Sequence, residues 1–174
     1  GYVSKIENLL MDQFAFNSLK IILDNSKKIL ENSNDEKTIT NLQYAAMMAG
    51  WVQNHCLIGV SHAIAHQMGS YKLSHGIANS IFLPESIIFN SKDSKNIKKY
   101  NKIALFCGLK NGMDELVDTI KILAESGEFS TKLSSYGIKK ENFDNITKLA
   151  LEDPGAKYNP LNLDEESLIT ILDK

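Results

Sequence analysis

Residues 59–76 of this chain read GVSHAIAHQMGSYKLSHG and hold three of its four histidines. His62 and His66 are four residues apart, so on a helix they project from the same face about one turn apart. His75 follows a predicted turn, and the glycine after it allows close approach of backbone or ligand. Clustered imidazoles suit a transition metal or a proton-transfer site, so this stretch predicts a helix that carries chemistry.

The apolar spacing outside this stretch is also helical almost throughout, and alternating strand patterns are nearly absent. We therefore predict one all-α domain over residues 1–174, folded as a multi-helix bundle. The segments expected to be helical are 9–32, a helix opened by the S-x-x-E run at 33–36, 59–72 with a break near Gly69, 77–90 with Pro84 inside or ending it, a helix after 111, 139–152 and 164–173.

Local signals refine these expectations. The S-x-x-E run at 33–36 predicts a capping box, and Asn111 predicts the N-cap of the helix that follows it. Small residues at 45, 46, 49 and 50 predict a helix that others approach closely, and hence a central one. The turn-rich segment 153–160 predicts an ordered loop.

Composition excludes several classes of function. The formal net charge of −2 gives no reason to expect a nucleic acid or an anionic membrane as partner, and no apolar run is long enough to span a membrane. The chain lacks G-x-G-x-x-G and G-x-x-x-x-G-K-[ST] phosphate loops. Two distant cysteines in apolar surroundings and the lack of a signal peptide predict a cytoplasmic protein with reduced core thiols.

The histidine cluster permits more than one interpretation. Three neutral imidazoles suit zinc or ferrous iron better than calcium or magnesium, although each histidine can also be an ordinary core or surface residue. Ala63 stands where the H-E-x-x-H metalloproteases have their glutamate, which argues against a protease. His55 is interpreted mainly as a helix C-terminal residue, and Cys56 as a core thiol.

The block 59–69, followed by HGIAN at 75–79, Leu-Pro at 83–84 and Phe-Asn at 89–90, resembles the signature of the iron-containing (group III) alcohol dehydrogenases. The resemblance extends upstream to 42–50, which is similar to the helix before that signature. Downstream it includes Asp153 and Asn159-Pro160, which are similar to the family's closing D…NP segment. It therefore covers essentially the whole chain.

The resemblance implies a helical C-terminal domain that carries Fe2+ or Zn2+, beside an N-terminal α/β domain that binds NAD or NADP. By position, His62 and His75 are metal ligands, and His66 is the catalytic and cofactor-binding histidine. The family's other two ligands, in a D-x-x-x-H run, are expected just before Gly1, as is the nucleotide-binding domain. The isolated chain is therefore expected to bind metal weakly and to be inactive.

The partners that the resemblance implies are a small alcohol or aldehyde, the missing N-terminal domain and, as in many members, further copies of the protein. One alternative is a free-standing helical module for metal binding or protein interaction, which completes its site with Cys56, His55, water or a partner chain. Another is kinship to glycerol dehydrogenases or dehydroquinate synthases, against which the HAIAHQMG block argues. Substrate, coenzyme and the choice of iron or zinc stay open.

Overall fold

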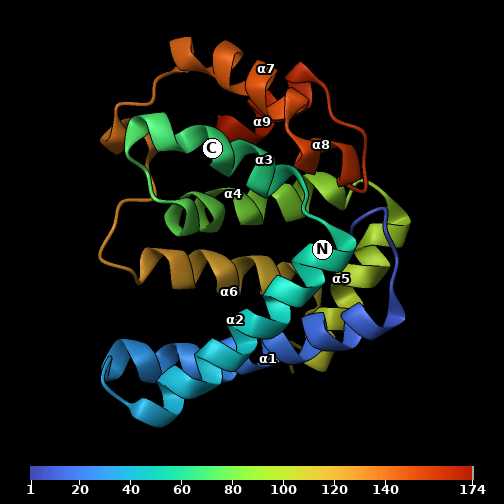
Figure 1. Ribbon diagram of the computed structural model, residues 1–174, viewed down its shortest axis with the longest axis vertical. Helices are drawn as coiled ribbons and strands as arrows, with labels where there is room; N and C mark the ends of the chain where they lie inside the picture. Colours follow the sequence, from blue (N-terminus) through green and yellow to red (C-terminus); the bar gives the residue numbers. More distant parts are fainter. Residues whose placement is uncertain (174) are drawn as a thin grey trace.

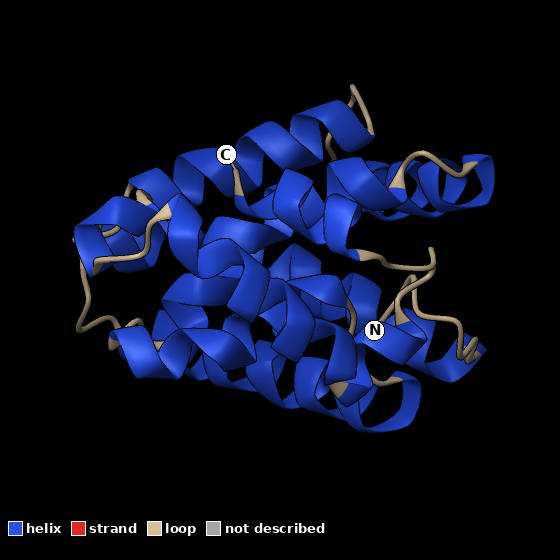
Figure 2. Cartoon of the chain, turned by 90° about the horizontal axis from the view of Figure 1, so that it is seen from above, coloured by secondary structure: helices blue, strands red, loops and turns tan. Residues whose placement is uncertain are grey.

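The computed structural model describes residues 1–173, and within that range the chain folds into helices without any strand (Figure 1, Figure 2). This confirms the predicted all-α fold. The α-helices are α1 (Leu9–Glu31), α2 (Glu36–Cys56), α3 (Val60–His66), α4 (His75–Asn90), α5 (Ser94–Phe106), α6 (Met113–Glu125), α7 (Phe143–Glu152), α8 (Pro154–Tyr158) and α9 (Glu165–Leu172). Short 3₁₀ turns cover Gln67–Tyr71, Leu133–Tyr136 and Lys140–Asn142.

The helices form layers. In Figure 1, α3, α7, α8 and α9 lie at the top, α4 and α6 cross the middle, and the α1–α2 hairpin lies at the bottom. The largest apolar core joins α3, α4, α7 and α9, and its most deeply buried large side chains are Ile64, Met68, Phe82, Ile146 and Leu168. None of the helices in residues 1–173 combines the length and apolar character needed to cross a membrane.

Two predicted helix starts are wrong. Helix α2 begins at Glu36 with Asp35 as its N-cap, whose carboxylate accepts the Thr38 amide hydrogen at 2.9 Å, so the start lies past the predicted capping box. Helix α6 is capped by Gly112, not Asn111. Gly112 has φ +65°, and a Cβ there would clash with the Asn101 side-chain oxygen, so both conformation and space favour glycine.

Other boundaries also differ from the predictions. The helix expected over 59–72 ends at His66 and continues as a 3₁₀ turn, and α4 starts two residues early, at His75, with Pro84 inside it. Residues 154–158 form α8 instead of a loop. Pro154 stands at the first position of this helix, where its missing N–H costs nothing, and Asp153 caps it.

The small-residue face of α2 is not central within the described chain. Of its small residues only Ala45 is buried, against α1, where the Ser18 hydroxyl donates to its carbonyl at 2.8 Å. Tyr44, Met47 and Trp51 are each more than half exposed on the same helix. A run of small residues allows another helix to pack closely against α2, but within the described chain only α1 does so.

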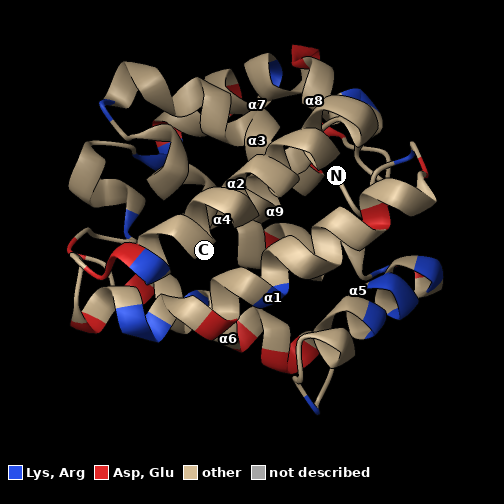
Figure 3. Cartoon of the chain, turned by 60° about the horizontal axis from the view of Figure 1, so that its bottom comes forward, with Lys and Arg blue, Asp and Glu red and all other residues tan. Residues whose placement is uncertain are grey.

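Charged side chains lie on the outside, and the lysines of α5 form a visible cluster (Figure 3). Lys95 and Lys99 both donate to the Glu7 carboxylate, at 2.9 and 3.0 Å. The two lysines hold the pKa of the exposed Glu7 carboxyl low, at about 2, mainly through these hydrogen bonds. These contacts fasten the segment before α1 to α5.

Candidate metal centre

Helix α3 exposes almost nothing except histidine. Five of its seven residues are buried, and the two that are not are His62 and His66. The buried side is apolar or small because α3 packs against α4, α7 and α8. The side of α3 that remains accessible therefore carries two imidazole side chains.

The start of α3 is held by a buried asparagine from the other end of the chain. The side-chain oxygen of Asn159 accepts the Val60 amide hydrogen at 3.2 Å. The Asn159 amide also pairs reciprocally with the amide of Asn90, at 2.8 and 3.2 Å, and donates to the Leu161 carbonyl at 2.9 Å. Asn159 is fully buried, so this network fixes α3 relative to α4 and to the segment after α8.

The structure brings the three predicted site histidines together. The ring centroids of His62 and His75 lie 5.1 Å apart, and those of His66 and His75 lie 5.3 Å apart and nearly parallel. The rings of His62 and His66 are 6.1 Å apart. The i, i+4 spacing places two of the rings on one face of α3, and the packing of α4 against α3 brings the third to them.

Two further residues orient these imidazoles. Asn79, one turn into α4, donates to Nε2 of His75 at 3.0 Å and accepts from the Ser61 hydroxyl at 3.0 Å. Nδ1 of His66 lies 2.8 Å from Oδ2 of Asp153. Sequence reasoning assigned no role to either partner. The resemblance had marked Asp153 and the HGIAN run, but an interaction across 87 residues has no local signal.

Electrostatics keep His62 neutral. Burial, and then the neighbouring His75, lower its pKa to about 4. At pH 7 its ring therefore carries no charge and offers a nitrogen lone pair. The Asn79 amide donates to Nε2 of His75, so that nitrogen is unprotonated, and its lone pair can serve a metal only when this amide gives way. Neutral imidazole is the form that ligates divalent metals.

The residues proposed for a free-standing metal module lie elsewhere. His55 is the next-to-last residue of α2, donates from Nδ1 to the Trp51 carbonyl at 2.8 Å, and stacks on the Trp51 ring. Cys56 is buried, and desolvation raises the pKa of its thiol, which disfavours the thiolate that a metal needs. Among the ring contacts of residues 1–173, none joins His55 to the other three histidines.

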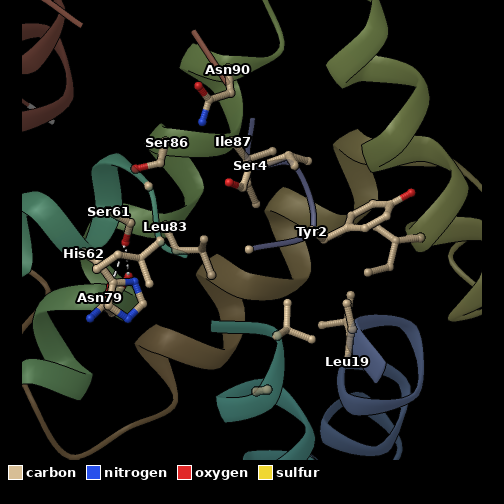
Figure 4. A pocket seen from close by; sticks show the side chains of 18 of the residues that line it. Tyr2, Ser4, Leu19, Ser61, His62, Asn79, Leu83, Ser86, Ile87 and Asn90 are labelled. Atoms are coloured by element: carbon tan, nitrogen blue, oxygen red, sulfur yellow. Dashed lines mark hydrogen bonds between the residues drawn. The ribbon is translucent and has the colours of Figure 1, made fainter. Parts of the chain in front are cut away.

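A mainly apolar cavity of about 410 Å³ adjoins the cluster. Figure 4 shows His62, Ser61 and Asn79 at one end of it, with Tyr2 and Leu19 toward the other. Asn90 and Ser86 of α4 line it as well. The cavity therefore runs from the histidine face toward the α1–α2 hairpin.

The donor set of this centre is partial. Within residues 1–173, no group of three or more His, Cys, Asp or Glu side chains is arranged to hold a metal ion. His62 offers a neutral nitrogen donor, while His75 is engaged through Nε2 with Asn79 and His66 through Nδ1 with Asp153. The chemistry of His62 and His75 suits Fe2+ or Zn2+, with further donors required to complete four ligands.

The fold and the three converging histidines define a helical domain with a candidate metal centre. The profile of the Fe-containing alcohol dehydrogenase family, C-terminal, matches residues 1–174. The chain therefore belongs to the Fe-containing alcohol dehydrogenase family and forms its C-terminal domain.

Individual relatives agree with this assignment. The chain is 29% identical over 176 residues to alcohol dehydrogenase 4 of Saccharomyces cerevisiae, and 30% identical over 183 residues to an NADPH-dependent butanol dehydrogenase of Clostridium saccharobutylicum. These matches cover 100% and 99% of this chain but 46% of each relative. The chain thus spans about half the length of the curated relatives that it matches.

Solved structures lead to the same fold. A 1,3-propanediol oxidoreductase superposes with a TM-score of 0.91 at 26% identity, covering 99% of this chain and 47% of the other. An alcohol dehydrogenase from Oenococcus oeni gives a TM-score of 0.85, also at 26% identity, and covers 99% of this chain and 46% of its own. By their names, these relatives are oxidoreductases that act on alcohols, which supports an alcohol oxidoreductase as the general class of enzyme.

Proposed function

We propose that this chain is the metal-binding part of an NAD- or NADP-dependent alcohol dehydrogenase, in which His62 and His75 ligate Fe2+ or Zn2+. The observation that carries the proposal is the convergence of two imidazoles, the neutral His62 from α3 and His75 from α4, with centroids 5.1 Å apart. The family assignment supports the class of reaction, which is hydride transfer between an alcohol and a nicotinamide.

When bound, the metal supplies Lewis-acid polarisation of the substrate oxygen. The work of this chain is to hold that ion with neutral donors. Burial keeps His62 uncharged, and Asn79 orients His75 through its amide. Because both donors are carried by helices packed into the main core, their geometry is set before a metal arrives.

His66 is proposed as the residue that moves a proton or positions the nicotinamide. Its side chain is 40% exposed, so it faces the open side of α3 and not the core. It lies one helical turn from His62, and its ring stacks on His75. An exposed imidazole beside two ligating ones is placed to exchange a proton with a substrate hydroxyl.

The proposed substrates are small alcohols and their aldehydes. The cavity beside His62 is mainly apolar, and butanol and 1,3-propanediol appear in the names of relatives. The other half of the full-length enzyme is proposed to bind the nicotinamide, because this chain lacks a phosphate-binding glycine loop. A cytoplasmic location, no nucleic-acid or membrane partner, and assembly into homo-oligomers remain part of the proposal.

The test uses the full-length protein that contains this chain. It is loaded with Fe2+ or Zn2+ and assayed for oxidation of C2–C4 primary alcohols with NAD+ and with NADP+. We expect His62→Ala and His75→Ala to lose bound metal and activity together. His55→Ala is the matched control and is expected to keep both. Full activity of the His62→Ala and His75→Ala variants would overturn the assignment.

A further inference from the structure

We propose that Asp153 is a positioning residue that holds His66 as its Nδ1–H tautomer, so that Nε2 is the nitrogen available for chemistry. This inference rests on the proposed function only in assigning His66 a role in the reaction. The tautomer itself follows from contacts within the chain.

The contact between the two side chains is short and directional. Nδ1 of His66 lies 2.8 Å from Oδ2 of Asp153, whose side chain is only 11% exposed. An ionised carboxylate can only accept hydrogen bonds, so the hydrogen must be on Nδ1. In the neutral ring the lone pair is then on Nε2, on the side of the ring away from Asp153.

Both oxygens of Asp153 are engaged, which is what makes it a fixed acceptor. Oδ1 accepts the Gly155 amide hydrogen at 2.7 Å as the N-cap of α8, leaving Oδ2 for His66. A Cβ on Gly155 would lie 3.0 Å from both Oδ1 and Ile58, so a side chain there would disturb the cap. The packing of α8 against α3 carries this carboxylate to the histidine.

Asp153 therefore connects two roles that a single substitution can separate. In Asp153→Asn, the retained side-chain oxygen can still cap α8 by accepting from Gly155, because asparagine is as good an N-cap as aspartate. The amide nitrogen that replaces Oδ2 is a donor and cannot accept from Nδ1–H of His66. The variant thus keeps the cap and disfavours the tautomer.

A matched control exists elsewhere in the chain. Asp164 is the N-cap of α9 and accepts the Ser167 amide hydrogen at 2.8 Å. Asp164→Asn makes the same chemical change at a helix start whose cap contacts involve no histidine. Similar small changes in Tm are expected for the two variants.

The first measurement is the ¹⁵N chemical shift of the His66 ring in the metal-free full-length protein, at a pH where the ring is neutral. We expect a protonated Nδ1 and an unprotonated Nε2 in the wild type and in Asp164→Asn, and a shift toward protonated Nε2 in Asp153→Asn. A wild-type ring protonated on Nε2 would overturn the proposal. This readout needs no substrate, so it decides the positioning even where dehydrogenase activity is absent.

The second measurement is steady-state alcohol oxidation by the metal-loaded full-length protein. Removal of the partner that orients a histidine at a metal site costs about 10- to 100-fold when that histidine is a ligand, and we expect the same range for His66 beside the ligands. We expect Asp153→Asn to lower kcat within that range with KM nearly unchanged, and Asp164→Asn to match the wild type. A kcat for Asp153→Asn equal to that of Asp164→Asn would contradict the proposal.

Discussion

Helices α2 and α3 follow one another in the chain and are built in opposite ways. Helix α3 has seven residues, of which only two histidines escape burial. Helix α2 has 21 residues, and only four of them are buried: Thr38, Ala45, Val52 and Cys56. It leaves Tyr44, Met47 and Trp51 more than half exposed.

The difference shows which of the two helices is buried by tertiary contacts. Helix α3 is short, so it depends on tertiary contacts instead of its own propensity, and the main core and Asn159 supply them. Helix α2 is long and contacts chiefly α1. The element that carries the site is therefore the one that its surroundings determine most completely.

The comparison predicts its largest effect at Ile64. This side chain is fully buried in α3, so Ile64→Ala is expected to lower the free energy of unfolding by about 2–5 kcal/mol through lost burial and the cavity left behind. Met47→Ala is the matched variant on α2, where the side chain is 56% exposed, and should cost well under half as much. Urea unfolding measures both; equal losses would break the contrast between the helices.

A somewhat smaller effect is expected at Asn159. Replacing it with alanine leaves the Val60 amide and the Asn90 side chain without their buried partner, at about 1–3 kcal/mol for an unsatisfied buried group. The exposed Asn145 serves as control, with Asn145→Ala expected to stay within about 0.5 kcal/mol of the wild type. If the two variants unfold at the same urea concentration, Asn159 does not anchor α3.

The last predicted effect is a pH dependence due to His62, which appears only below about pH 6.5. Its pKa is about 4 in the folded protein against an ordinary 6.5, so the unfolded chain takes up a proton more readily as the pH falls. The metal-free protein should therefore lose stability between about pH 6.5 and 4, with no change from this group above 6.5. Thermal unfolding across this range should show a shallower loss for His62→Gln, and identical slopes would count against the lowered pKa.

Much of the fold was predictable because helical periodicity depends on neighbours three and four residues away. The helix ends were less predictable: Asn111 is a good capping residue by type, yet Gly112 caps α6 because a glycine fits against Asn101. Within residues 1–173 the central position predicted for α2 was wrong, for a related reason. Small residues indicate that a helix can be approached, and only the assembled chain shows whether one does.

In the candidate site, too, some features could be predicted from the sequence and others could not. The shared face of His62 and His66 follows from local spacing, so the sequence could predict it, whereas His75 joins them through the packing of α4 against α3. The contacts of Asp153 with His66, and of Asn159 with Val60, join residues 87 and 99 positions apart and depend on how α8 and the segment after it return to α3. Sequence similarity marked these residues without indicating what they contact.

The central claim is that the packed helix α3 presents its histidines, with His75, as the metal-binding face. It is tested most directly by adding Zn2+ to the metal-free 174-residue chain and following the ring signals of all four histidines by NMR. We predict that His62 and His75 shift together, that His55 does not, and that dialysis removes the metal because two imidazoles bind it weakly. Zinc that stays bound through dialysis, or that shifts His55 instead of His62 and His75, would contradict the account.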